Sequence, residues 1–130
     1  MGNEANQQPV ALRERARFAA QHNDEALAET AYTQLLESQP GDLEALKFLA
    51  RCQLMRSAGH RAVELMQIAV RAHPDDAPAW HQLGTSHMLD GNMEAASDSL
   101  RRAVQLAPGM FEAHLRLGIV LERLGDSHQA

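Results

Sequence analysis

Three prolines, Pro40, Pro74 and Pro108, stand 34 residues apart in this chain of 130 residues, and this spacing constrains the fold more than any other feature. An alanine stands twelve residues before each of them, at Ala28, Ala62 and Ala96. A fixed period of about 20 to 50 residues is typical of repeat architectures, in which each repeat is one small supersecondary unit. The sequence therefore predicts an array of similar units stacked along one axis.

Further columns align when the chain is written in rows of 34 residues. One column holds small residues, namely Ala16, Ala50, Gly84 and Gly118. Another column holds large apolar residues, namely Tyr32, Met66 and Leu100. Small residues let two helices approach closely, and large residues fill the space between neighbouring pairs. We infer that each row forms two packed helices.

Composition and helix punctuation favour an all-α fold. Alanine, leucine, glutamate and arginine dominate the periodic stretches, and clusters of β-branched residues typical of strands are absent. Each proline stops a helix, and Asp42 and Asp76 stand where the next helix needs an N-cap. Within the rows, Asn23-Asp24, Gly59, Gly91-Asn92 and Gly125-Asp126 are expected to separate two helices. The expected helices span 9–21, 24–38, 43–56, 59–72, 77–89, 92–106 and 111–124.

The third row carries a family resemblance. It reads Trp80-x2-Leu83-Gly84-x2-His87, then Ala96-x3-Leu100, Ala103 and Pro108. This resembles the tetratricopeptide repeat, whose pattern is W-x2-L-G-x2-Y, A-x3-F and P. His87 replaces the usual tyrosine and Leu100 the usual phenylalanine. The resemblance implies a right-handed α-solenoid of about seven helices. Its repeats would span 9–42, 43–76 and 77–110, with a partial repeat at 111–130 and a disordered lead-in at 1–8.

The last partial repeat supports two further expectations. The sequence ends as a second helix of a fourth hairpin would begin, which favours a fragment of a longer protein over a complete chain. The helix over 111–124 carries an apolar face where a polar cap would be expected. This face is expected to support self-association as a homodimer through Leu117, Val120, Leu121 and Leu124.

Charge and motif content exclude several function classes. The formal net charge is −5, with 12 basic and 17 acidic residues, which argues against nucleic-acid binding. No apolar run approaches the roughly 18 residues of a membrane span, and the start lacks the features of a signal peptide. The seven histidines and the single Cys52 show no metal-ligand or catalytic spacing. We expect a cytoplasmic, non-enzymatic segment without a cofactor or a metal.

The family resemblance also implies where a partner would bind. First helices of successive hairpins line a concave groove in this family. The groove residues transferred through the 34-residue columns are Arg13, Arg17, Lys47, Phe48, Arg51, His81, Gln82, Thr85 and Arg116. The same columns add Arg123 and the apolar residues Met55, Leu89, Leu115 and Ile119.

A basic run in an acidic chain indicates the chemistry of the ligand. Arg13, Arg17, Lys47 and Arg51 lie on two adjacent first helices. We expect a protein or peptide that is acidic or ends in a C-terminal carboxylate, with an apolar anchor. The alternative is that these cations form a solvated face paired with Glu14 and Glu44. The family's carboxylate clamp for chaperone tails is not expected, because Phe48, Pro78 and Glu112 break its pattern.

Three functions remain open on the sequence alone. The leading one is a protein–protein interaction scaffold. The second, from the resemblance, is the regulatory or substrate-recruiting region of a larger bacterial enzyme, such as an aspartyl/asparaginyl hydroxylase, a sulfotransferase or a glycosyltransferase. The third is self-association through the terminal helix.

Overall fold

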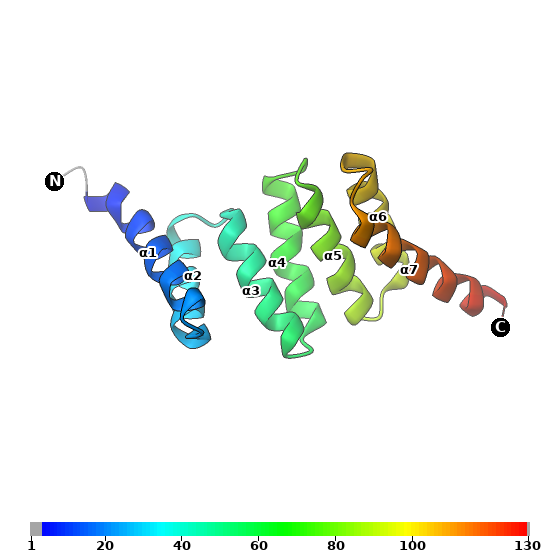
Figure 1. The fold of residues 1–130 in the computed structure, drawn as a ribbon, viewed down its shortest axis with the longest axis horizontal. Coiled ribbons are helices and arrows are strands. Elements are labelled where there is room, and N and C mark those ends of the chain that lie inside the picture. Colours follow the sequence, from blue (N-terminus) through cyan, green and yellow to red (C-terminus); the bar gives the residue numbers. More distant parts are fainter. Residues whose placement is uncertain (1–3, 130) are drawn as a thin grey trace.

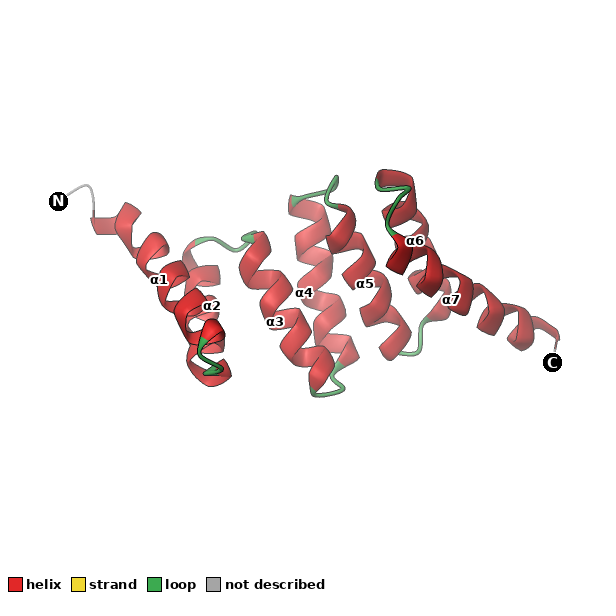
Figure 2. Cartoon of the chain, in the orientation of Figure 1, coloured by secondary structure: helices red, strands yellow, loops and turns green. Residues whose placement is uncertain are grey.

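The computed structural model describes residues 4–129, with side chains described for residues 8–126. This part of the chain forms seven α-helices joined by short loops and contains no strand (Figures 1 and 2). The helices are α1 (Glu4–Gln21), α2 (Glu25–Ser38), α3 (Leu43–Met55), α4 (Gly59–Ala72), α5 (Ala77–Leu89), α6 (Met93–Leu106) and α7 (Phe111–Gln129). The expected all-α fold is confirmed.

The helices stack in one direction, from α1 at one end to α7 at the other (Figure 1). Each helix packs on the next one along the chain. In addition, α3 contacts α5 and α5 contacts α7, whereas α2, α4 and α6 do not contact one another within the described residues. From the second hairpin onwards, the first helices therefore lie closer together than the second helices, whereas α1 and α3 show no such close backbone approach among the described residues. This difference curves the stack and places α3, α5 and α7 on its concave side.

The turns inside the hairpins repeat with the 34-residue period. Asn23, Ser57 and Gly91 take left-handed φ angles of 60°, 60° and 83°, and each follows a first helix. The next residue is the N-cap of the second helix. Between hairpins, the side chains of Asp42 and Asp76 accept hydrogen bonds from the third residue beyond them. Both predicted N-caps are confirmed.

The repeat columns form the core. Ala28, Ala62 and Ala96 are completely buried, which lets the two helices of each hairpin pack closely. The large-residue column is buried as well, with Tyr32, Met66 and Leu100 at most 4% exposed. One apolar cluster joins α3, α4 and α5, so the second and third hairpins share a continuous core. The alignment of columns therefore predicted packing between rows as well as within them.

Both terminal helices are longer than the sequence predicted. The helix α1 begins at Glu4 and includes Pro9, so the expected disordered lead-in at 1–8 is wrong for residues 4–8. Residues 1–3 lie outside the described part. Pro9 is the sixth residue of α1 and lies beyond its first turn, so this helix continues through a proline, which most helix interiors exclude. The helix α7 continues through Gly125, where a break was predicted, because one glycine costs a helix only about 1 kcal/mol.

None of the helices described between residues 4 and 129 combines the length and the apolarity that crossing a bilayer would require.

Candidate functional site

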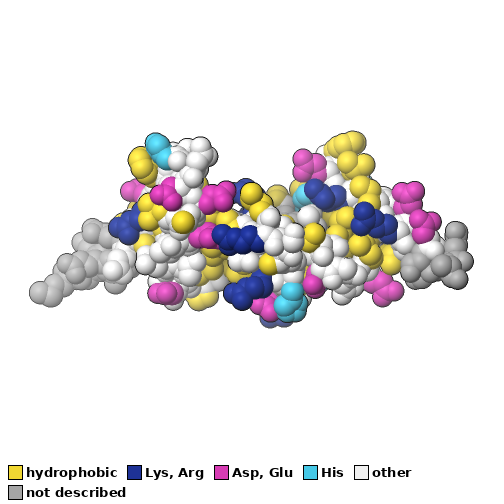
Figure 3. Space-filling model, turned by 90° about the horizontal axis from the view of Figure 1, so that it is seen from below, with side chains coloured by type: hydrophobic (Ala, Val, Ile, Leu, Met, Phe, Trp, Pro, Cys, Tyr) yellow, Lys and Arg dark blue, Asp and Glu magenta, His cyan; other side chains and the backbone are white. Residues whose placement is uncertain are grey.

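The expected groove residues all lie on the first helices of the hairpins, and they divide into two groups. Basic and acidic side chains lie side by side near the middle of the face in Figure 3, and basic and apolar ones lie together towards the C-terminal end. The residues are Arg13 and Arg17 on α1, Lys47, Phe48 and Arg51 on α3, His81, Gln82 and Thr85 on α5, and Arg116 on α7.

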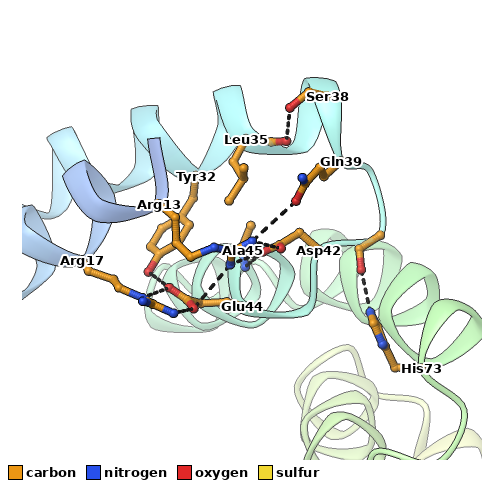
Figure 4. Close-up of polar contacts among 11 residues, drawn as sticks. Arg13, Arg17, Tyr32, Leu35, Ser38, Gln39, Asp42, Glu44, Ala45 and His73 are labelled. Carbon is orange, nitrogen blue, oxygen red and sulfur yellow. Dashed lines mark hydrogen bonds and ion pairs between the residues drawn. The ribbon is translucent and has the colours of Figure 1, made fainter. Parts of the chain in front are cut away.

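Arg13 crosses from the first hairpin to the second. Its guanidinium donates hydrogen bonds to both carboxylate oxygens of Asp42, at 2.5 and 3.1 Å (Figure 4). A third bond reaches Glu44 Oε1 at 3.4 Å. Asp42 also caps α3, so its carboxylate is only 10% exposed. Arg13 is therefore committed to a partner inside the chain.

Besides the bond from Arg13, Glu44 accepts three hydrogen bonds from α1 and α2. Arg17 donates through Nε at 2.9 Å and Nη2 at 2.6 Å, and the Tyr32 hydroxyl donates at 2.7 Å (Figure 4). These hydrogen bonds, Arg17 first, lower the pKa of Glu44 to about 2, against the opposing effect of burial. Burial and the bond to Glu44 raise the pKa of Tyr32 to about 12. Glu44 thus remains ionised and Tyr32 neutral across the ordinary pH range.

Lys47 and Arg51, the other two cations of the basic run, also contact side chains of the same chain. Lys47 Nζ lies 2.8 Å from Asp76 Oδ2, and the Arg51 guanidinium lies over the ring of Phe48 at 5.5 Å from its centroid. The alternative expectation was that these cations pair with acidic residues of the same chain. Glu44 does form such ion pairs, whereas Glu14 forms none in the described part. The sequence predicted Asp42 and Asp76 as N-caps, but not as ion-pair partners of cations on the preceding first helix.

The C-terminal part of the concave side has a different character. A cavity of about 320 Å³ opens between α3, α5 and α7 and is lined by Leu54, Thr85, Met88, Leu89, Arg116 and Arg123. Leu89 is 49% exposed at its edge. Neither Arg116 nor Arg123 forms an ion pair with any residue of the described chain. An apolar wall and two available cations therefore meet at one site.

Other predicted groove residues are used within the array. Gln82 Nε2 donates to the Lys47 carbonyl at 2.9 Å and so ties α5 to α3. The Thr85 hydroxyl donates to the His81 carbonyl at 3.1 Å. His81 Nε2 is buried without a hydrogen-bond partner in the described chain. Burial, and then the positive charge of Arg116, lower the pKa of His81, so its ring stays neutral near pH 7.

Comparison with known families agrees with this geometry. A sequence profile described as tetratricopeptide repeat matches residues 16–86, which is more than half of the chain, and a second profile with the same description matches residues 77–110.

The chain belongs to the tetratricopeptide repeat family.

Solved structures show the same fold. The first tetratricopeptide domain of Spaghetti (RPAP3) bound to the HSP90 peptide SRMEEVD superposes with a TM-score of 0.83 at 19% identity, over 92% of this chain and 94% of that one. MamA from Desulfovibrio magneticus gives 0.80 at 25% identity, over 93% and 68%. The O-GlcNAc transferase of Thermobaculum terrenum gives 0.79 at 27% identity, over 93% of this chain but 23% of that one. A search of curated protein sequences found no match to this chain.

The prediction of a self-association surface on α7 of this tetratricopeptide array is wrong for one residue. Val120 is completely buried against α6, in a cluster with Ala96 and Leu100. Leu117 and Leu124 are partly buried against the same cluster, and Leu121 is 39% exposed. The apolar face of α7 is therefore largely used to attach this helix to α6, which the repeat columns alone did not distinguish from an open face.

Two lining residues of the cavity were missed from sequence. Leu54 and Met88 stand 34 residues apart, so they form a column of their own that could have found them. In the described residues no group of three or more His, Cys, Asp or Glu side chains is arranged to hold a metal ion. Cys52 is buried, and burial raises the pKa of its thiol.

Proposed function

We propose that this array is a protein-interaction module that holds a peptide segment of its partner at the cavity between α3, α5 and α7. The observation that carries the proposal is the composition of this cavity. Three successive first helices contribute to it, and its wall combines Leu54, Met88 and Leu89 with two arginines that have no partner in the described chain. Such a mixture of apolar wall and oriented charge is typical of sites where one anchor side chain is buried.

The size of the cavity fits one large apolar side chain with its neighbours. Burying a leucine or methionine side chain contributes roughly 1.5 to 3 kcal/mol, which a partner would gain here. Met55, which follows the lining residue Leu54 at the end of α3, is a further exposed apolar side chain, at 69% exposure. The peptide complex of the Spaghetti domain shows that an array of this shape can hold a peptide.

The test is a selection of binding peptides from a random display library, followed by a matched pair of variants. Leu89→Asp places a charge at the cavity, and Ile68→Asp places the same charge on α4, at a separate cavity that shares no residue with the first. The two residues are similarly exposed, at 49% and 43%, so their costs in stability are comparable. We expect Leu89→Asp to weaken the selected peptides at least about tenfold and Ile68→Asp to leave them within about twofold.

The opposite ranking, or equal effects of the two variants, would reject the concave cavity as the binding site. Circular dichroism melting curves of both variants establish that each is folded at the assay temperature.

We propose as a second candidate function that the array is the partner-recruiting region of a larger enzyme. It is supported by the likeness to the O-GlcNAc transferase, in which the matching part is 23% of the chain. Sequencing the reading frame beyond the codon for Ala130 tests it. A catalytic domain in frame is the expected result, and a stop codon directly after Ala130 rejects the candidate.

A further inference from the structure

The cations of the concave side differ in whether they already have an anion. Arg13, Arg17 and Lys47 each lie within 2.8 Å of a carboxylate oxygen of the same chain. Arg116 and Arg123 have no such carboxylate among the described residues and line the cavity instead. An incoming anion would have to displace an existing ion pair at the first set, but not at the second. Arg51 also has no carboxylate partner in the described chain, but it lies over the Phe48 ring and does not line the cavity. The place for an anionic ligand is therefore the α7 side of the cavity.

The two arginines both line the cavity from α7. Seven residues separate them, which is close to two helical turns, so both lie on one face of α7 at an axial distance of about 10 Å. Met88 and Leu89 lie across from them on α5, and Leu54 lies on α3. Glu112 and Glu122 are near in sequence but do not line the cavity. One apolar pocket thus has two positive charges along its α7 side.

From this arrangement we propose that the bound segment carries a carboxylate side chain on each side of its apolar anchor, two positions away, and that Arg116 and Arg123 bind one carboxylate each. The inference rests on the proposed function and specifies its ligand. In an extended peptide, residues two positions from the anchor point to the same side as the anchor. Four residues of strand span about 13 Å, which two flexible arginine side chains about 10 Å apart can match.

Charge complementarity also separates this ligand from two others. A segment with a single C-terminal carboxylate would engage one arginine and leave the second without a partner. A basic segment would be repelled by both. His81 beside Arg116 is neutral near pH 7, because burial lowers its pKa, and Glu112, which also acts on His81, does not line the cavity. An acidic-x-apolar-x-acidic segment is the class that satisfies both arginines and the apolar wall together.

The experiment uses two random peptide libraries, one tethered at both ends and one with a free C-terminus. We expect binders from the tethered library, enriched in Asp or Glu two positions before and after a Leu, Met or Phe. Their affinity is then measured on Arg116→Gln/Arg123→Gln and on the control Arg101→Gln/Arg102→Gln. The control arginines are exposed on α6, and the change in net charge is the same.

The expected result is a loss of at least about tenfold in the first double variant, a change within about twofold in the control, and weaker binding to the wild type as salt is added. Three results would overturn the inference. The selected peptides could lack flanking acids, they could retain their affinity for the first double variant, or binders could come from the free C-terminal library alone. In those cases a loss on Leu89→Asp would still support the cavity as the binding site. Binders unaffected by Leu89→Asp would instead reject the proposed function itself, and the ligand inference with it.

Discussion

Gly84 of α5 lies directly against Leu100 of α6. A β-carbon on Gly84 would lie 2.6 Å from Leu100 Cγ and 2.9 Å from its Cδ2. Leu100 is itself completely buried, so its side chain would have to shift within the core. Gly118 occupies the same column one repeat later, yet no atom lies within 4 Å of the corresponding position. One sequence column therefore contains a required glycine and a replaceable one.

This contrast predicts opposite effects of one substitution. Gly84→Ala should destabilise the array by about 1 to 3 kcal/mol, because the new methyl group overpacks the core. Gly118→Ala should stabilise it by up to about 1 kcal/mol, because alanine is the better helix former. Urea unfolding followed by circular dichroism measures both. A destabilised Gly118→Ala would show that α7 has a close neighbour on that side in solution.

The repeat columns explain how much of the fold was predictable. Close packing requires small residues at Ala28 and Ala62 and large ones at Met66 and Leu100, so core positions can be read from spacing alone. The N-caps Asp42 and Asp76 could be predicted for the same reason, since capping depends on local sequence. The helix ends at Glu4 and Gln129 could not, because helices without strong stop signals end where weak local preferences balance.

The site was less predictable because it depends on contacts between side chains of different repeats. The sequence left open whether Arg13 and Arg17 bind a ligand or pair with Glu14 and Glu44, because the distance to Asp42 and Glu44 is set by how two hairpins stack. The columns do not record this distance. Likewise Val120 and Leu121 look equally apolar in sequence, and only the packing of α7 on α6 buries one and exposes the other.

Glu44 predicts a specific acid sensitivity. Its pKa is lowered from 4.5 to about 2 in the folded chain, so the folded state favours the ionised form. Its contribution to stability is complete above about pH 4.5 and is lost as the pH falls from there towards 2. Glu44→Gln should cost about 1 kcal/mol at pH 7, a modest value because the Glu44 side chain is 31% exposed, and should flatten stability across this range.

Chemical denaturation at pH 7, 4 and 3 measures the effect. The control is Glu122→Gln, an exposed carboxylate without an ion pair in the described chain. Equal pH profiles for the two variants would contradict the role given to Glu44.

Arg13 should matter more for stability than its neighbour Arg15. Arg13→Ala removes a two-pronged ion pair to a nearly buried carboxylate and should cost about 1 to 2 kcal/mol. Arg15 is exposed and forms no ion pair with a described residue, so Arg15→Ala should stay within about 0.5 kcal/mol. Thermal unfolding ranks the two, and equal melting temperatures would contradict the prediction.

His87 predicts a second pH dependence, closer to neutrality. Its Nδ1 is buried without a partner in the described chain, and burial lowers its pKa from 6.5, with Asp90 opposing the change. The unfolded chain therefore takes up the proton more readily, and stability falls as the pH drops below about 6.5. His87→Phe should reduce this loss between pH 7 and 5. The free energy of unfolding is measured by guanidinium denaturation at several pH values. If His87→Phe leaves its dependence on pH unchanged, His87 is protonated as easily in the folded chain as in the unfolded chain.

Asp42 serves two hairpins at once, since it caps α3 and receives Arg13 from α1. The boundary between the first two repeats is consequently not a neutral place to cut or splice the chain. Removing the first hairpin would leave Asp42 and Glu44 as adjacent carboxylates without their cations, at the exposed end of the shortened array. A hairpin transplanted in front of α3 would need arginines in the places of Arg13 and Arg17 to restore the joint, so the repeats share a common length without being interchangeable parts.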